Sequence, residues 1–170
     1  MDAGYVLIIM TKQRLQMRLQ LSEQSFDTTW PCRAIVRGDA PALGALMLAA
    51  YQGTIDYAGE TLEEAITAVQ EMLGGRYGLL LDYCSFVLEQ AGQPIGASII
   101  TFWKSTPLVC DIMVHPAHKN KGLGTFLLKQ SANALFEQGY RDLVLYVTVG
   151  NDNAQHVYEK LGFKVEETSP

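Results

Sequence analysis

The sequence predicts a mixed α+β fold in which a central β-sheet is flanked by helices. Short β-rich segments alternate with segments whose apolar residues recur at helical spacing, in the order β-α-α-β-β-β-α-β-α-β. The 170 residues are 48% hydrophobic, which suffices for one domain with a substantial core. Charged residues make up 18%, and no repeat or low-complexity stretch interrupts the pattern, so the composition argues against disorder.

The first 32 residues carry the least regular pattern, and we expect an N-terminal extension before a domain over residues 33–170. Tyr5–Met10 fits a short strand, whereas Thr11–Leu21 carries leucines and basic residues at helical spacing. Tyr5–Met10 is too short to span a membrane and follows no basic region typical of a signal peptide. Three widely spaced cysteines without a C-x-x-C arrangement fit a reducing compartment, and the histidines show no metal-ligand spacing. We therefore expect a cytoplasmic protein without membrane association and without a metal site.

Two helices are predicted near the start of the domain. The polar and apolar alternation of Arg33–Arg37 favours a strand before them. Asp39 is a residue type that caps helices, and it directly precedes the first helical run. Thr61, with Glu64 three residues later, has the pattern of a capping box for a helix over Leu62–Leu73, which two glycines end.

The second half of the domain alternates β-rich runs with helical runs that end at glycines. One β-rich run is nearly continuously apolar, as in a strand that is buried on both faces. The expected elements are strands over Ser85–Glu89 and Ile95–Phe102 joined through residues 91–94, a strand over Leu108–Val114, a helix over Gly122–Gln138, the apolar strand Leu143–Val149, a helix over Ala154–Leu161 and a strand over Phe163–Glu167.

The charges are unevenly distributed. With 13 Lys and Arg against 18 Asp and Glu, the formal net charge is −5, and no clustered basic surface is expected. Because nucleic-acid affinity depends on clustered Lys and Arg, we expect no nucleic-acid partner. Residues 38–111 hold nine acidic and only two basic residues, which fits either an acidic site or solvated helix faces.

A loop between a strand and a helix carries the strongest chemical signal. Residues 119–125 read KNKGLGT, so two lysines flank two glycines that open a helix. The free N–H groups and the dipole of a helix start favour an anion, and glycine lets a phosphate approach the backbone. A diphosphate would suit this loop, whereas a tight turn with exposed lysines is the alternative. The loop is not a P-loop, and it fails G-x-G-x-x-G because Leu127 occupies the third glycine position.

This loop resembles the acyl-CoA pyrophosphate loop of the GCN5-related N-acetyltransferase (GNAT) superfamily, whose motif is [RQ]-x-x-G-x-[GA]. Here the motif reads Lys119-Asn120-Lys121-Gly122-Leu123-Gly124, with Lys119 where the family usually has Arg or Gln. A second family motif, N-x-x-A-x-x-x-Y-x-x-x-G-F, is matched from Asn151 to Phe163, and the family's V-x-P is present at Val114-His115-Pro116. The resemblance covers roughly Ala34 to Val165.

The resemblance implies the GNAT acyl-CoA N-acyltransferase fold and acetyl transfer from acetyl-CoA to a primary amine of a small molecule or peptide. Attack would be direct, in a ternary complex. A non-catalytic acyl-CoA binding or sensing module is the alternative, and a structural subunit of an acetyltransferase complex is a third reading. Relatives often complete a short last strand with a neighbouring subunit, so a homodimer is a further expectation.

By the same resemblance, the main chain of the loop would bind the pyrophosphate, and the preceding strand would pair with the pantetheine arm. Tyr158 would be the general acid, with a packing aromatic as the alternative, and Asn151 would contact the cofactor arm. Asn153 is the better placed of the two asparagines to cap the last helix. The residues expected to bind acetyl-CoA are Met113, Val114, Lys119, Asn120, Lys121, Gly122, Leu123, Gly124, Thr125, Asn151, Asn153 and Tyr158.

The general base and the acceptor site are less clearly marked. Asp111 lies on the cofactor strand, where it should share a face with Val109 and Met113, and it is the first candidate for the base. His115 and Glu60 are weaker candidates. The acidic loop between the first two helices would shape an acceptor site that attracts a cationic amine. The residues expected to bind the acceptor are Tyr51, Asp56, Tyr57 and Glu60.

Overall fold

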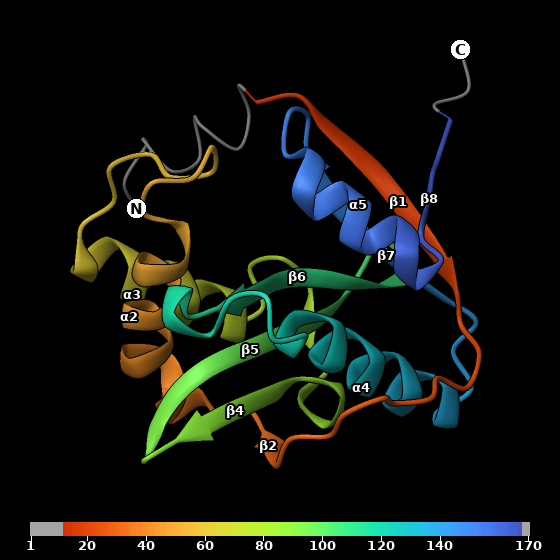
Figure 1. The fold of residues 1–170 in the computed structure, drawn as a ribbon, viewed down its shortest axis with the longest axis horizontal. Helices are drawn as coiled ribbons and strands as arrows, with labels where there is room; N and C mark the ends of the chain where they lie inside the picture. The colour runs from red at the N-terminus through yellow and green to blue at the C-terminus, as the bar shows by residue number, and fades with distance from the viewer. Residues whose placement is uncertain (1–11, 168–170) are drawn as a thin grey trace.

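The computed structural model describes residues 12–167 and confirms the mixed α+β fold (Figure 1). The strands form one eight-stranded sheet in the order β2-β4-β5-β6-β7-β1-β8, and β3 pairs with β5 off this path. The strands are β1 Arg14–Gln20, β2 Cys32–Ala34, β3 Leu79–Leu80, β4 Phe86–Gln90, β5 Gln93–Trp103, β6 Thr106–Val114, β7 Asp142–Thr148 and β8 Lys164–Val165. The helices are η1 Arg37–Asp39, α2 Ala40–Tyr51, α3 Leu62–Leu73, η2 Asp82–Cys84, η3 Pro116–His118, α4 Leu123–Glu137 and α5 Asp152–Leu161.

Helices cover both faces of the sheet. On one face, α2 and α3 enclose a core with inward side chains such as Val87 and Ile99. On the other face, the start of α4 packs on Leu88, which follows Val87 along β4. The later turns of α4 join a core with β1 and β7. This alternation is the one that a strand imposes on successive side chains. No helix within residues 12–167 is long and apolar enough to cross a membrane.

The expected helix over Thr11–Leu21 is wrong, because Arg14–Gln20 is strand β1. Its apolar residues recur at every second position, and Met17 and Leu19 are 0% and 7% exposed against β7. A period of two indicates a strand rather than a helix. The segment expected as an N-terminal extension therefore contributes a strand to the interior of the sheet. The expected strand Tyr5–Met10 lies outside the described residues.

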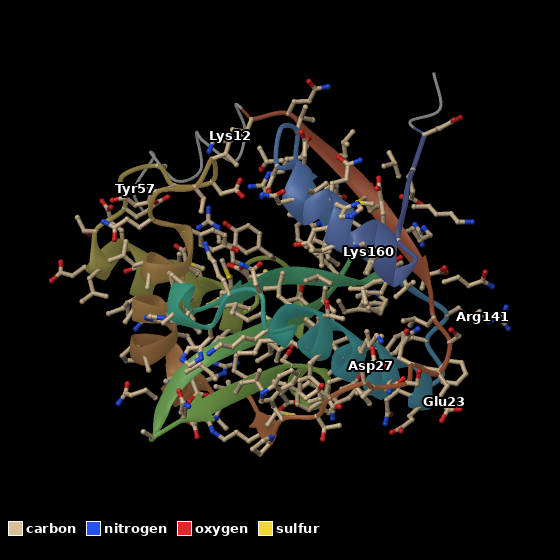
Figure 2. All side chains as sticks on the ribbon, viewed as in Figure 1. Lys12, Glu23, Asp27, Tyr57, Arg141 and Lys160 are labelled. Carbon is tan, nitrogen blue, oxygen red and sulfur yellow. The ribbon has the colours of Figure 1, made fainter. Side chains whose placement is uncertain are left out.

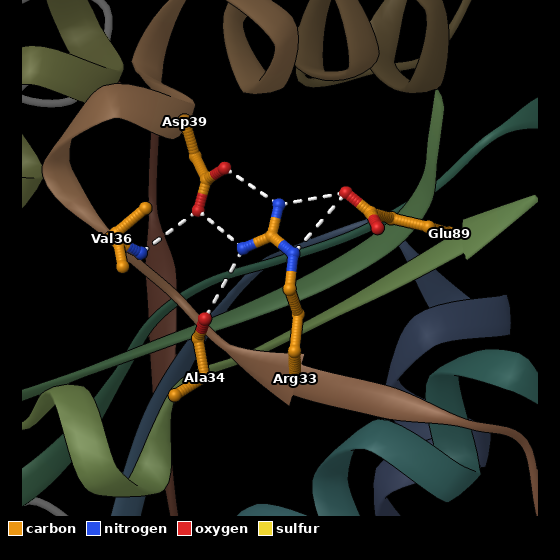
Figure 3. Close-up of polar contacts among 5 residues, drawn as sticks. All are labelled: Arg33, Ala34, Val36, Asp39 and Glu89. Atoms are coloured by element: carbon orange, nitrogen blue, oxygen red, sulfur yellow. Dashed lines mark hydrogen bonds and ion pairs between the residues drawn. The ribbon is translucent and has the colours of Figure 1, made fainter. Parts of the chain in front are cut away.

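A charged cluster fixes the start of α2 to the sheet (Figure 3). The Arg33 guanidinium donates to both carboxylate oxygens of Asp39 at 2.7 and 2.9 Å, and to Glu89 at 2.7 Å. Asp39 also accepts the Val36 N–H at 2.8 Å, and its side chain makes no cap bond to α2. Asp39 is the N-cap residue of α2, as expected, but its side chain does not cap the helix, because Arg33 and the preceding 3-10 turn occupy its carboxylate. The capping box of α3 is confirmed, since Thr61 and Glu64 exchange both of its bonds.

The hairpin between β4 and β5 turns through two residues rather than the expected four. Ala91 and Gly92 both have positive φ, of 51° and 74°. Two such residues match the twist of the flanking strands, so pairing resumes at once and Pro94 lies inside β5 opposite Glu89.

The two strands at the centre of the sheet diverge. β6 and β7 are parallel, and their pairing is limited to Leu108 opposite Val144, near the start of each strand. The edge of β6 beyond Leu108 is therefore left open towards β7. All other strand pairs are antiparallel.

Candidate active site

A cavity of about 630 Å³ lies where β6 and β7 diverge. Figure 1 shows α2 and α3 on one side of this region and α5 with β1 on the other. The cavity has the size and mixed lining typical of a small-molecule site. Its polar lining residues are Lys12, Arg14, Tyr51, Asp56, Glu60, Tyr77, Lys104, Asp111, Tyr146, Thr148, Asn151 and Tyr158.

The loop after β6 forms an uncapped helix start. Asn120 and Gly122 adopt left-handed backbone conformations, with φ of 62° and 79°. Gly122 is the N-cap residue of α4 and offers no side chain to the first turn of the helix. Among the described residues, no hydrogen bond engages the N–H groups of residues 121–125, whereas the Phe126 N–H donates to Gly122 O at 2.9 Å. Free N–H groups at the positive end of a helix dipole suit an anion, so the loop fits a diphosphate.

The open edge of β6 presents main-chain groups to the gap. The His115 N–H donates to Ile95 O at 2.8 Å, and main-chain polar groups alternate sides along a strand. The polar groups of Met113 therefore point to β5, whereas those of Ile112 and Val114 point to the open edge. The Tyr51 hydroxyl donates to Ile112 O at 3.2 Å across this gap, which agrees with that alternation.

A β-bulge sets the direction of Asp111. Opposite Ile99 lies Asp111 and opposite Ile100 lies Val109, so Cys110 is the extra residue of β6. A bulge re-aims the side chains that follow it. Val109 packs in the core with α4, Cys110 packs in the core beneath α2 and α3, and the Asp111 carboxylate accepts the Tyr51 hydroxyl from α2. The expectation that Asp111 shares a face with Val109 is therefore wrong, because the bulge breaks the alternation between them.

Asp111 is an acid with an altered proton affinity. Its side chain is 9% exposed, and burial raises its pKa to about 7. The Tyr51 hydroxyl, the Ile112 N–H and the positive charge of Arg14 act in the opposite direction, and Asp56 adds to the rise. A carboxylate with a pKa near 7 can accept a proton and release it again near neutral pH.

Tyr158 faces the same cavity from α5. Its ring packs edge-on against Phe163, with centroids 6.0 Å apart. Within the described part of the chain its hydroxyl makes no hydrogen bond. Burial raises the pKa of Tyr158 to about 12, with smaller contributions from Asp111 and Asp56. The phenol therefore stays protonated and can donate a proton into the cavity.

The loop after α2 crosses the gap and is tied to the other side. Asp56 accepts the Thr148 hydroxyl at 2.6 Å and the Asn151 amide at 3.3 Å. Asn151 also accepts the Ala154 N–H at 3.3 Å and so caps α5. The expectation that Asn153 is the better cap is therefore wrong, because α5 begins at Asp152. Both functional groups of Asn151 are engaged within the protein.

Three other candidates lie differently. Tyr57 does not line the cavity, and its hydroxyl donates to Glu60 O at 3.4 Å. His115 accepts the Ala117 N–H at 3.1 Å and is also absent from the cavity lining. Glu60 lines the cavity, where one of its carboxylate oxygens accepts the Ala58 N–H at 3.0 Å. Asp111 is therefore the buried acid of the cavity among the three candidates for the base.

Comparison with known proteins decides the family. A model of the acetyltransferase (GNAT) family matches residues 51–163, which hold most of the sheet, the uncapped loop and α5. The chain belongs to the acetyltransferase (GNAT) family. Streptothricin acetyltransferase from Streptomyces lavendulae is 38% identical to this GNAT chain over 92 residues, which are 52% of this chain and 49% of that protein. The GNAT chain thus matches about half the length of this curated relative.

Solved GNAT structures share the fold. A GCN5-related N-acetyltransferase from Sphaerobacter thermophilus superposes with a TM-score of 0.69 at 17% identity, covering 90% of this chain and 48% of that chain. The ribosomal-protein-S18-alanine N-acetyltransferase from Escherichia coli gives a TM-score of 0.65 at 25% identity, covering 81% of this chain and 79% of that chain. The fold predicted from the two GNAT motifs is therefore confirmed.

The sequence did not predict that three basic residues line this GNAT cavity. Lys12 and Arg14 come from β1 or just before it, and Lys104 lies in the turn between β5 and β6. The sequence does contain a signal for Arg14, because the alternation of polar and apolar residues over β1 indicates a strand. In the structure this strand pairs with β7 and places Arg14 opposite Thr148. Lys104 carries no local signal, since only the folded sheet brings that turn beside the cavity.

Proposed function

We propose that this GNAT domain transfers an acetyl group from acetyl-CoA to a primary amine by direct attack. The observation that carries the proposal is the convergence of Asp111 and Tyr158 on one cavity at the open edge of β6. The same strand leads, through η3 and a short loop, to an uncapped helix start that fits a diphosphate. A donor with a diphosphate at one end and a thioester at the other matches this arrangement, and acetyl-CoA supplies that activated acetyl group when bound.

The main chain accounts for binding of the donor. The N–H groups at the start of α4 would hold the diphosphate, with Lys119 and Lys121 adding positive charge. The open edge of β6 would pair with the amide-containing arm as an additional strand would. The Val114 N–H, which points to this edge, would donate to the carbonyl oxygen on which negative charge develops.

The side chains account for two proton movements. Asp111 would take the proton that the attacking amine must lose, since its pKa of about 7 keeps a useful fraction ionised near neutral pH. Tyr158 would give its proton to the sulfur that leaves as the carbon–sulfur bond breaks. The new carbon–nitrogen bond replaces the thioester bond, so no covalent bond to the protein is required.

The direct test is turnover of acetyl-CoA with a panel of primary amines. Release of the free thiol and the mass of the acetylated amine should rise together, and both should require the amine. Streptothricin belongs in the panel because a matched relative is named for it. Tight binding of acetyl-CoA without acetylation of any amine would contradict the proposal and favour the alternative function, a non-catalytic acyl-CoA sensing module.

A further inference from the structure

The cavity holds three acidic side chains, but each already has a partner in the protein. Asp56 accepts from Thr148 and Asn151 with its two oxygens. Glu60 accepts a main-chain N–H of its own loop, and Asp111 accepts the Tyr51 hydroxyl. In the acidic loop predicted to attract a cationic amine, the carboxylates therefore already accept hydrogen bonds that fix the loop in its position.

The basic side chains of the cavity make fewer contacts with the rest of the protein. Across residues 12–167, the ion pairs of the protein involve Arg18, Arg33 and Arg76 and leave Lys12, Arg14 and Lys104 without a carboxylate. Lys12 donates to the carbonyl of Ile55, as its position beside the loop after α2 allows (Figure 2). Lys104 lies 5.8 Å from the centre of the Trp103 ring. The three basic side chains of the cavity therefore have no carboxylate partner within residues 12–167, whereas its three acidic side chains already accept hydrogen bonds.

Arg14 is the best placed of the three to bind a ligand. It makes no hydrogen bond to another described residue and lies on β1 opposite Thr148, whose hydroxyl binds Asp56. Its positive charge is close enough to Asp111 to affect the proton affinity of that carboxylate. A guanidinium presents paired N–H groups that match the two oxygens of a carboxylate or phosphate.

We propose that the acceptor amine carries an anionic carboxylate or phosphate group, which Arg14 binds while Asp111 faces the amine. The proposal rests on the proposed acetyl transfer and specifies the class of its acceptor. A simple cationic polyamine would leave the Arg14 guanidinium without an anionic partner and would be a poorer substrate. Compounds with both charges, such as amino acids, peptide ends or aminoalkyl phosphates, fit the cavity better.

The test compares matched acceptors that differ only in the anion. Amino acids with a terminal amine, from glycine to 6-aminohexanoate, are compared with alkylamines of the same chain length, lysine with cadaverine, and phosphoethanolamine with ethanolamine. We expect the anionic member of at least one pair to have a kcat/KM about tenfold higher or more, as a charged hydrogen bond provides. The pair with the largest ratio identifies the anion as carboxylate or phosphate and gives the spacing.

Variants assign the preference to Arg14. Arg14→Gln should remove the preference for the anionic acceptor, whereas Arg14→Lys should keep part of it. The matched control is Arg141→Gln, which should leave the preference unchanged, because Arg141 is also exposed and lies far from Lys12 in the molecule (Figure 2). Thermal unfolding of each variant should match that of the wild type, because both arginines are at the surface.

A binding measurement separates this inference from the proposed function. Calorimetry with CoA present should show that the protein binds the acetylated anionic product more tightly than its uncharged counterpart. This difference should be present only when Arg14 is intact. Equal rates and equal binding within every pair would overturn the inference while acetyl transfer stands. A preference that survives Arg14→Gln would also overturn it. If no amine is acetylated, the proposed function fails, and the calorimetric comparison still decides whether the cavity selects an anion.

Discussion

Two buried aspartates of this protein have nearly the same exposure, but their pKa values are shifted in opposite directions. Asp39 is 8% exposed and Asp111 is 9% exposed. The guanidinium of Arg33 lowers the pKa of Asp39, whereas burial raises the pKa of Asp111 to about 7. Asp39 meets a full positive charge at hydrogen-bond distance, and Asp111 meets a phenol. Exposed area alone therefore does not decide the direction of a pKa shift, because the depth of burial and the charge of the hydrogen-bond partner both contribute.

The largest expected effect is on catalysis. Asp111→Asn keeps the shape of the side chain but removes the proton acceptor, so we expect kcat/KM to fall by about 10²–10⁴-fold. Asp39→Asn is the matched control and should lower the rate far less in protein that is still folded. The measurement is the initial rate of amine acetylation. Equal rate losses in both variants would mean that Asp111 acts only through the fold.

Removal of the Tyr158 hydroxyl should have the next largest effect. We expect Tyr158→Phe to lower kcat by about 100-fold, at the low end for proton transfer, because a thiolate is already a good leaving group. CoA affinity, measured by calorimetry, should remain near that of the wild type. Tyr83→Phe, which removes a hydroxyl that pairs with Tyr140 outside the cavity, is the control. An unchanged kcat in Tyr158→Phe would remove this residue from the mechanism.

The two aspartates should also shape stability in opposite ways. The raised pKa of Asp111 means that its ionisation costs stability, progressively as pH rises from about 4 to about 7. Asp111→Asn should therefore gain stability relative to the wild type over that range, by roughly 2–4 kcal/mol. Asp39, whose pKa is lowered, contributes stability above its unfolded pKa, and that contribution is lost as pH falls through its folded pKa.

The matched variant Asp39→Asn should accordingly lose about 2 kcal/mol near neutral pH and less in acid. Urea unfolding of the three proteins between pH 3 and pH 8 gives both differences. Parallel pH profiles for the two variants would contradict the contrast between the aspartates.

The smallest expected effect is a shift in pH dependence. Asp111 must be ionised to act as a base, so kcat/KM should increase with pH, and the midpoint of this increase should lie at about pH 7. Tyr51 stabilises the ionised form, so Tyr51→Phe should move this midpoint upward, by about one pH unit. Tyr57→Phe, which loses only a bond to a main-chain carbonyl, should leave the midpoint in place. A downward shift in Tyr51→Phe would contradict the role given to its hydroxyl.

Local sequence patterns correctly predicted the features that depend on a few consecutive residues. The capping box at Thr61 and the uncapped helix start at Gly122 lie where the sequence placed them, because both depend on a few consecutive residues. The direction of Asp111 was not predictable, since it depends on the pairing between β5 and β6 that leaves Cys110 as a bulge. The position of Arg14 in the cavity depends on β1 joining the sheet beside β7, and the helical spacing of that segment did not predict this position.

The bonds of Asp56 restrict how this protein can be redesigned. Its carboxylate joins the loop after α2 to the end of β7 and to the N-cap residue of α5. A replacement loop from a relative with another acceptor would have to offer a pair of acceptor oxygens at the same point. Without them, the Thr148 hydroxyl and the Asn151 amide would lose their partners, and the turn that leads to Tyr158 would loosen. Exchange of acceptor specificity should therefore succeed only for grafts that retain an acid at position 56.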